Sequence, residues 1–214
     1  MIRLALVDYG SGNVRSVRRA LEAAATHAGM SLRVELTADP QELAKAERIV
    51  LPGVGHFADC AAGLKRPPGL IEALDDAVRR RGAPFLGVCV GMQLMADVGR
   101  EDEEVPGLGW ARGAVERLRP SDPSLPVPHM GWNSLGGALS HPVLQGIGRT
   151  PEVYFTHSYA FMAGDPRDVA ATCDYGGAFV AAIARETMFG TQFHPEKSQA
   201  IGLRLLANFL AWRP

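Results

Sequence analysis

Short apolar runs alternate with amphipathic segments through the first half of the chain. Four runs have the length, aliphatic content and flanking turn residues of buried strands: residues 2–7, 32–36, 48–51 and 85–88. The segments between them predict helices over residues 13–25, from Asp39 onward, and over residues 69–81. This alternation predicts an α/β fold with a doubly wound, mainly parallel sheet and helices on both faces.

The pattern changes after about residue 105. Short β-like runs at 114–118, 153–155, 169–172 and 179–183 are separated by turns rich in glycine and proline. We expect them to be antiparallel additions to the same sheet, so that residues 1–214 form a single domain. A last strand is expected from Met188 to Phe193, and the apolar stripe over residues 198–212 predicts a C-terminal helix.

The composition excludes several classes of protein. The chain has 214 residues, 47% of them hydrophobic, and a net charge of −1, which does not match the basic footprint of a nucleic-acid-binding protein. No apolar run approaches the ~18 residues of a membrane span, and the N-terminus does not resemble a signal peptide. The three cysteines predict no disulfide framework, and no Cys or His pair has metal-ligand spacing. We therefore expect a cytoplasmic protein with no metal and no cofactor.

Cys89 stands in the most informative segment. It follows the apolar run 85–88, and Gly87 and Gly91 flank it at two residues on either side. A Gly-x-nucleophile-x-Gly segment between a strand and a helix is typical of an elbow that exposes a nucleophile. The N-terminus of a following helix would favour the thiolate. Cys60 and Cys173 lack such flanks and are expected to be buried apolar side chains.

A base for this nucleophile is expected at His194. The strand ending at Phe193 delivers it, and Glu196 follows beyond Pro195, which restricts the turn. His194 would take the thiol proton and Glu196 would orient the imidazole. Because ligands bind at the carboxyl ends of parallel strands, we expect Cys89, His194 and the turn 52–55 at one edge of the sheet.

These motifs resemble those of the class I, triad-type glutamine amidotransferases, which have a flavodoxin-like fold. The resemblance rests on residues 87–93 (Gly-Val-Cys-Val-Gly-Met-Gln) and on 194–196 (His-Pro-Glu). Further segments resemble the glutaminase subunits of imidazole glycerol phosphate synthase: 8–13 (Asp-Tyr-Gly-Ser-Gly-Asn), 52–55 (Pro-Gly-Val-Gly), 128–133 (Pro-His-Met-Gly-Trp-Asn) and 156–159 (Thr-His-Ser-Tyr). The resemblance extends over residues 2–212.

The resemblance implies hydrolysis of L-glutamine to glutamate and ammonia. The ammonia would pass to a (β/α)8-barrel cyclase subunit, in a heterodimer that makes imidazole glycerol phosphate and an aminoimidazole carboxamide ribonucleotide for histidine biosynthesis. Cys89 would be the nucleophile, His194 the base and acid, and Glu196 the orienting group. Amides of Val54, or its immediate neighbour, and of Val90 would form the oxyanion hole.

The resemblance also implies a substrate pocket and a partner surface. Residues expected at the glutamine pocket are Gly53, Gly55, Gln93, Thr156, His157, Ser158 and Tyr159. Residues expected near the cyclase are His129, Met130, Trp132, Asn133 and Lys197. We place Trp132 in a glycine-rich loop and favour an interface role over a core role, because tryptophan is enriched at interface hot spots.

Two positions depart from the family pattern. Val90 replaces the leucine that often follows the catalytic cysteine, but only its backbone N–H is required. His56 stands where a small residue often follows the Pro-Gly-Val-Gly turn. A histidine there is able to titrate near neutrality, although a solvated loop histidine is the simpler interpretation.

Three other functions are compatible with parts of this pattern. The chain could serve another amidotransferase, such as anthranilate or pyridoxal phosphate synthase, but the segment 130–133 argues against that. It could be a γ-glutamyl peptidase that acts without a partner. A degenerate, partner-binding subunit is disfavoured because Cys89, His194 and Glu196 are all present.

Overall fold

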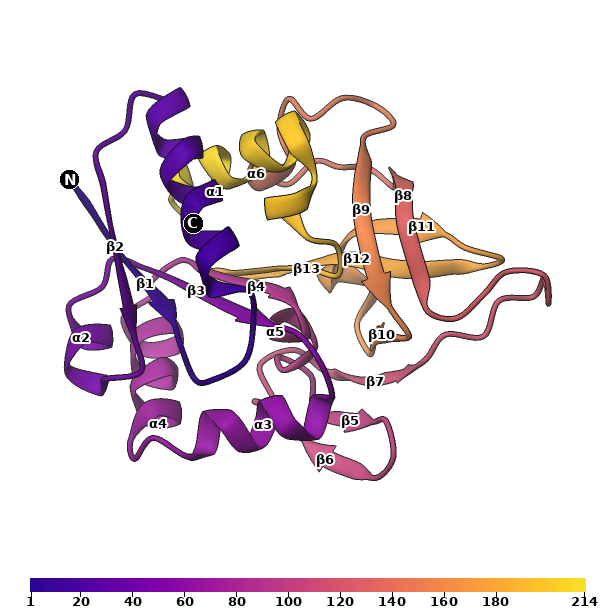
Figure 1. Cartoon of the computed structure of the whole chain (residues 1–214), viewed down its shortest axis with the longest axis horizontal. Helices are drawn as coiled ribbons and strands as arrows, with labels where there is room; N and C mark the ends of the chain where they lie inside the picture. The colour runs from indigo at the N-terminus through magenta and orange to yellow at the C-terminus, as the bar shows by residue number, and fades with distance from the viewer.

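A nine-stranded sheet forms the centre of the molecule in the computed structural model, which describes all 214 residues (Figure 1). Five neighbouring strands are parallel and have the order β2-β1-β3-β4-β13: β1 (Ile2–Val7), β2 (Leu32–Thr37), β3 (Arg48–Gly53), β4 (Phe85–Cys89) and β13 (Met188–Thr191). This is the flavodoxin-like order of a doubly wound sheet, as the alternating pattern predicts.

Four antiparallel strands extend the sheet beyond β13. They are β12 (Ala178–Arg185), β11 (Val169–Asp174), β8 (His129–Gly136) and β9 (Glu152–His157), in that order. Three of the β-like runs predicted for the second half of the chain lie in β9, β11 and β12. The fourth element, β8, is a strand where a glycine-rich loop was expected, so Trp132 lies in a strand.

Helices cover both faces of the parallel strands (Figure 1). One face carries α1 (Val14–His27) and α6 (Gln199–Ala211), which pack against each other. The opposite face carries α3 (Phe57–Lys65) and α4 (Leu70–Asp75), which continues into a π-helical turn, Asp76–Arg80. The short helix α2 (Pro40–Ala44) begins at Asp39, whose side chain accepts the N–H of Gln41 as an N-cap. The sequence pattern did not predict α3.

A second, four-stranded sheet was also not predicted. Its order is β10-β7-β5-β6, from β10 (Tyr159–Ala163), β7 (Gly113–Arg117), β5 (Val98–Arg100) and β6 (Glu104–Pro106). The run at 114–118, expected in the main sheet, lies mostly in β7 and pairs with β10. The alternation along a strand specifies its buried face but not its partner, and only the chain path after β9 brings β10 to β7.

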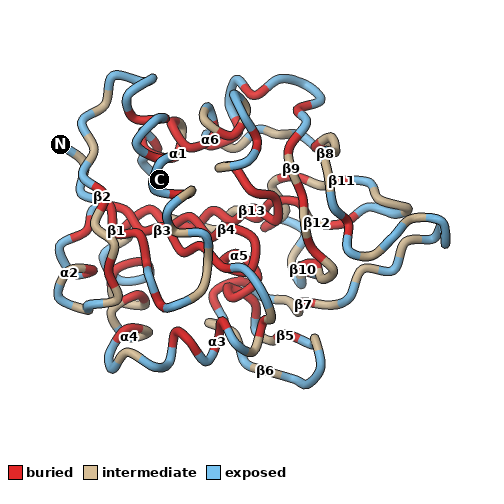
Figure 2. The backbone as a smooth tube through the Cα atoms, in the orientation of Figure 1, coloured by how far each residue is buried: buried red, intermediate tan, exposed pale blue.

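One contiguous apolar core includes residues from both sheets, such as Phe189 of β13 and Phe161 of β10. Figure 2 shows buried residues concentrated along β1, β3, β4 and β13. None of the helices is both long and apolar enough to cross a membrane.

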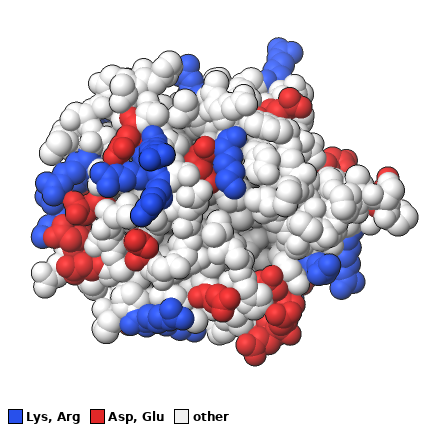
Figure 3. Space-filling view, in the orientation of Figure 1, with Lys and Arg blue, Asp and Glu red and all other residues white.

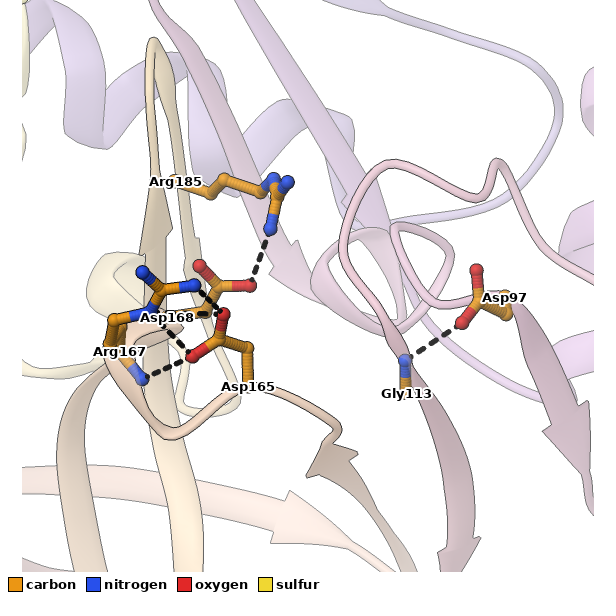
Figure 4. A network of polar contacts seen from close by, with 6 residues as sticks. All are labelled: Asp97, Gly113, Asp165, Arg167, Asp168 and Arg185. Atoms are coloured by element: carbon orange, nitrogen blue, oxygen red, sulfur yellow. Dashed lines mark hydrogen bonds and ion pairs between the residues drawn. The ribbon is translucent and has the colours of Figure 1, made fainter.

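Polar contacts tie the connections to the sheets (Figure 4). The Asp97 carboxylate accepts the N–H of Gly113 at 2.9 Å and so anchors the start of β7. On another connection, Asp165 accepts bonds from Arg167, and the buried Asp168 pairs with Arg185 at 3.1 Å. These pairs lie at connections between strands, so we assign them a structural role.

Candidate active site

Cys89 ends β4 in a strained backbone conformation. Its φ of +54° lies in the left-handed region, which costs free energy for a residue with a side chain. The next helix, α5 (Val90–Gln93), begins directly after it, as predicted, but is only one turn long. The flanking glycines are required by close packing: a Cβ on Gly91 would lie 1.9 Å from the Leu51 carbonyl oxygen, and one on Gly87 would lie 2.6 Å from that of Gly91. The elbow therefore packs closely against β3, and its two flanking glycines pack against each other.

His194 lies just beyond β13, the strand parallel to β4. Its Nδ1 lies 2.8 Å from Oε1 of Glu196, and both side chains are 2% exposed. The backbone around it is fixed, because His194 N donates to the Tyr154 carbonyl and the Ser198 hydroxyl donates to the His194 carbonyl. His194 Nε2, the other ring nitrogen, makes no hydrogen bond within the chain.

Burial and neighbouring groups act in opposite directions on His194. Burial disfavours the charged imidazolium, but interactions with Cys89 and Glu196 outweigh it and raise the His194 pKa to about 9. The imidazolium is therefore the stable form of this ring at neutral pH.

A cleft of about 470 Å³ opens above Cys89. It contains most of the residues expected at the catalytic and substrate sites: Val54, Gly55, Cys89, Val90, Gln93, Thr156, His157, Ser158, Tyr159 and His194. Lys197, expected at the partner surface, also lines it. The cleft also contains Asn13 and Pro128, which belong to the segments 8–13 and 128–133 but were not expected to line it, and Glu101, which no motif includes. Glu101 lies in the turn between β5 and β6, at the start of the acidic run 101–104.

Gln93 belongs to a chain of amides that leads to the nucleophile. Its Nε2 donates to the Tyr159 carbonyl at 2.9 Å and to Oε1 of Gln192 at 3.0 Å. Nε2 of Gln192 in turn lies 3.7 Å from the Cys89 sulfur. Gln192 is fully buried and no motif singled it out, although it directly precedes the Phe193-His194 pair.

The turn 52–55 is held by contacts on the side that faces away from the cleft. The Val54 carbonyl accepts a hydrogen bond from the Ser11 hydroxyl at 2.7 Å, and the Cys60 thiol lies 3.5 Å from it. Neither Ser11 nor Cys60 lines the cleft. In a planar trans peptide the C=O and the next N–H point in opposite directions, so the Gly55 N–H points away from Ser11. Gly53 itself is closely packed, since an added Cβ would lie 2.8 Å from Gly91 N.

His129 and His157 form a buried pair beside the cleft. His129 Nδ1 lies 3.2 Å from His157 Nε2, and His157 Nδ1 lies 2.9 Å from the Tyr159 carbonyl. The His129 ring stacks between Phe155 and Tyr175. Burial lowers the pKa of both histidines to about 4, so both are neutral at pH 7. His129, expected near the partner, is therefore an interior residue.

The other residues expected near a partner lie on or beside β8. Met130 is 63% exposed and Trp132 45% exposed, and they alternate on the outer side of the strand. Trp132 contacts the ring of Tyr154, and Lys197 Nζ lies 5.5 Å from the centre of the same ring. Asn133 points back, and its Nδ2 donates to the Asp174 carbonyl. Figure 3 shows few charged atoms over β8 and β9.

Comparisons with known proteins identify the family that the chain resembles. The sequence profile of the glutamine amidotransferase class-I family matches residues 5–212. The chain is similar to the imidazole glycerol phosphate synthase subunit HisH of Rhodospirillum rubrum (54% identity) and of Brucella abortus strain 2308 (51%), in each case over the full length of both chains.

Solved structures of lower sequence identity share the fold. One crystal structure of a glutamine amidotransferase superposes with a TM-score of 0.71 at 18% identity, covering 97% of this chain and 99% of that one. A glutamine amidotransferase from Thermotoga maritima gives a TM-score of 0.60 at 17% identity, covering 91% and 76%. With the full-length relatives, these findings show that the chain belongs to the class I glutamine amidotransferase family, and within it to the HisH subunits of imidazole glycerol phosphate synthase.

Proposed function

We propose that residues 1–214 act as one catalytic unit that hydrolyses L-glutamine and delivers the ammonia to a cyclase subunit in histidine biosynthesis. The observation that carries the proposal is the strained elbow at Cys89, which shares a cleft with His194, while Glu196 holds the His194 ring from behind. A nucleophile, a base and an orienting carboxylate are the groups that acyl transfer requires.

The reaction would begin with the Cys89 thiolate and the His194 imidazolium. The thiolate attacks the carboxamide carbon, and the tetrahedral intermediate collapses as the C–N bond breaks and His194 protonates the leaving ammonia. A water then attacks the thioester, His194 takes its proton, and glutamate leaves as the C–S bond breaks. Glu196 holds the imidazole through its Nδ1 hydrogen bond throughout.

Backbone amides would stabilise the oxyanion. Val90 follows the nucleophile at the first position of α5, and the turn 53–55 supplies a second amide from Val54 or its neighbour Gly55. Each such donor contributes roughly 2.7–4 kcal/mol to the stabilisation of the transition state. The Ser11 hydroxyl supports the arrangement of the turn by binding the Val54 carbonyl.

Recognition of the amino-acid end would fall to Glu101 and the segment 156–159. Glu101 is the only carboxylate that lines the cleft, so it is the group that would pair with the substrate α-ammonium. Lys197, at the same cleft, is available to the α-carboxylate, although the resemblance places it near the partner.

The cyclase would bind the outer side of β8. The exposed Met130 and Trp132 and the neighbouring Lys197 give an apolar patch with a charged edge, which is typical of a protein interface. Because the turn 52–55 adjoins the same cleft, we propose that the loaded partner stabilises the arrangement in which the turn donates an amide N–H to the oxyanion, and so switches on the glutaminase. A single gained oxyanion donor corresponds to about a hundredfold stimulation or more.

The test compares Cys89→Ala with wild type in the complex with a cyclase subunit. We expect glutamine-dependent synthesis to be abolished and synthesis from ammonium salts to persist, because Cys89 serves only amide cleavage. Cys173→Ala is a matched control, since this buried cysteine lies away from the cleft.

Two results would reject the proposal. Glutaminase activity that survives in purified Cys89→Ala protein would remove Cys89 as the nucleophile. Full wild-type activity without the cyclase would instead favour a hydrolase that acts alone.

A further inference from the structure

The side chain of His56, next to the turn 52–55, takes part neither in the elbow at Cys89 nor in the proposed reaction. It directly follows the turn 52–55 and precedes the first residue of α3. Its imidazole does not cap the helix. Instead, Nε2 lies 2.9 Å from Oδ2 of Asp102 and 3.7 Å from Oε2 of Glu101. His56 therefore joins the segment that carries the oxyanion turn to the segment that carries the cleft carboxylate.

The carboxylate of Glu101 is held on one oxygen only. Oε2 accepts the N–H of Phe57 at 2.7 Å and faces His56, whereas Oε1 makes no hydrogen bond or ion pair within the chain. Glu101 lines the cleft and His56 does not. The histidine thus lies behind the carboxylate, and one carboxylate oxygen is left for a group inside the cleft.

The carboxylates in the turn between β5 and β6 repel one another, so Glu101 needs a group that holds it toward the cleft. Residues 101–104 are four consecutive acidic side chains, and the neighbouring Arg100 pairs with Glu104 and Glu116. Like charges at this spacing repel one another, so an unsupported Glu101 would favour orientations toward solvent. Phe57 keeps the two segments in register, since its ring lies where a Cβ on Gly99 would be. His56 adds the only cation-capable side chain that faces Glu101 and Asp102.

We propose that His56 is a positioning residue for substrate binding. Its Nε2–H holds the Glu101–Asp102 turn so that the free oxygen of Glu101 faces the α-ammonium of an L-α-amino acid amide. The inference rests on the proposed glutaminase function, and it assigns a residue that acts through Glu101 without contacting the substrate.

Three substitutions at position 56 separate this role from a merely structural one, each assayed as the complex with a cyclase subunit. His56→Ala should raise the KM for glutamine about tenfold with kcat within about twofold, as expected for the loss of one charge-assisted hydrogen bond. His56→Gln, whose Nε2 reaches the position of the imidazole Nε2, should recover most of the affinity. His56→Asn, which is too short, should behave like His56→Ala. Glu103→Gln is the control, since this acidic neighbour makes no contact with His56.

A double-mutant cycle tests whether the effect passes through Glu101. In the Glu101→Gln background, His56→Ala should cause no further rise in KM. Glutaric acid monoamide, which lacks the α-amino group, should be hydrolysed with the same kcat/KM by wild type and by His56→Ala. Alkylation of Cys89 by iodoacetamide should proceed at the same rate in both proteins, while protection by glutamine should need about ten times more glutamine in the variant.

The possible failures are distinguishable. A wild-type complex that does not hydrolyse glutamine would overturn the proposed function itself. If wild type is active, an unchanged KM in His56→Ala overturns this inference alone. A loss of kcat at constant KM, or an equal rise in KM in the Glu101→Gln background, would also overturn it, because either result would assign His56 to the oxyanion turn or to folding.

Discussion

At the scale of single residues, the chemistry depends on how His194 is charged. The ring is almost fully buried, which by itself would favour the neutral form. Cys89 and Glu196 reverse that preference and raise the His194 pKa to about 9. Cys89 therefore faces a cation over the physiological pH range, and the Glu196 carboxylate holds that cation through the hydrogen bond to Nδ1.

Alkylation of Cys89 by iodoacetamide at different pH values tests this charge state. Since the imidazolium persists below about pH 9, we expect Cys89 to be alkylated faster in wild type than in His194→Asn at pH 7 and 8, because the variant lacks the cation. Equal rates in the two proteins would contradict the ion-pair interpretation.

Substitutions of His194 and Glu196 should lower kcat by different amounts. His194→Asn removes the group that carries the proton and should lower kcat by several orders of magnitude, whereas Glu196→Gln removes only the orienting charge and should cost less. Steady-state glutaminase assays of the complex measure both. A larger loss in Glu196→Gln would show that the roles are assigned wrongly.

At the scale of elements, β8 shows how a strand presents two different faces. Met130 and Trp132 point outward, while His129 and Leu135 are buried. The period of two places an exposed apolar surface and a part of the core on the same eight residues. Trp132 is exposed, outside the apolar core, and its ring meets the Tyr154 ring at 76° with centroids 6.0 Å apart, so its side chain contributes little to the core.

Trp132→Ala should therefore weaken binding without unfolding the chain. We expect an increase of about 30-fold or more in the Kd for the cyclase, which corresponds to the ~2 kcal/mol of a hot-spot residue. The free energy of unfolding of the isolated chain should change by about 0.5 kcal/mol or less. Titration calorimetry and thermal melts measure the two effects.

Met162→Ala is the matched control for this prediction. Met162 is 52% exposed but belongs to β10 in the four-stranded sheet. Its removal should leave the Kd unchanged. A fall in the melting temperature of Trp132→Ala as large as the loss of affinity would instead identify Trp132 as a core residue.

At the scale of the whole molecule, the buried pair of His129 and His157 links stability to pH. Both have a pKa lowered to about 4, below the ordinary value of about 6.5 that they regain on unfolding. Between these values the unfolded chain binds more protons than the folded chain. The neutral pair therefore makes its full contribution to the free energy of unfolding above about pH 6.5. That contribution is lost as the pH falls toward 4.

We expect the free energy of unfolding to fall with decreasing pH in that window, by up to about 1.4 kcal/mol per pH unit for each histidine. His129→Phe keeps an aromatic ring in the stack and removes one titrating group, so its acid slope should be shallower than that of wild type. Urea unfolding at pH 4 to 7 gives the slopes, with the exposed His27→Gln as control. An unchanged slope in His129→Phe would mean that His129 does not titrate in this window.

Much of the fold could be predicted because periodicity is a local property. The four early strands, the helices between them and the C-terminal helix follow from apolar spacing, and the elbow follows from two glycines around one cysteine. The helix at Phe57–Lys65 was not predicted, because small residues such as Ala61 and Gly63 weaken the periodicity of its apolar positions. The strand β8 was missed because its glycines suggested a loop.

The candidate site was only partly predictable for a similar reason. Cys89 and His194 stand in motifs, but Glu101 and Gln192 have no local signal. The turn between β5 and β6 places Glu101 at the cleft, and the chain beyond β13 places Nε2 of Gln192 3.7 Å from the Cys89 sulfur. Likewise, the Ser11 contact to Val54 joins two turns 43 positions apart.

The amino-acid sequence by itself determined the fold class and the family and predicted a nucleophile and its base, because these depend on spacing and residue type within short segments. Tertiary structure alone decided which sheet each late strand joined, that His129 is interior while Trp132 is exposed, and that His56 lies beside Glu101 and Asp102. These outcomes depend on pairing between distant segments and on burial, which local patterns along the chain do not encode.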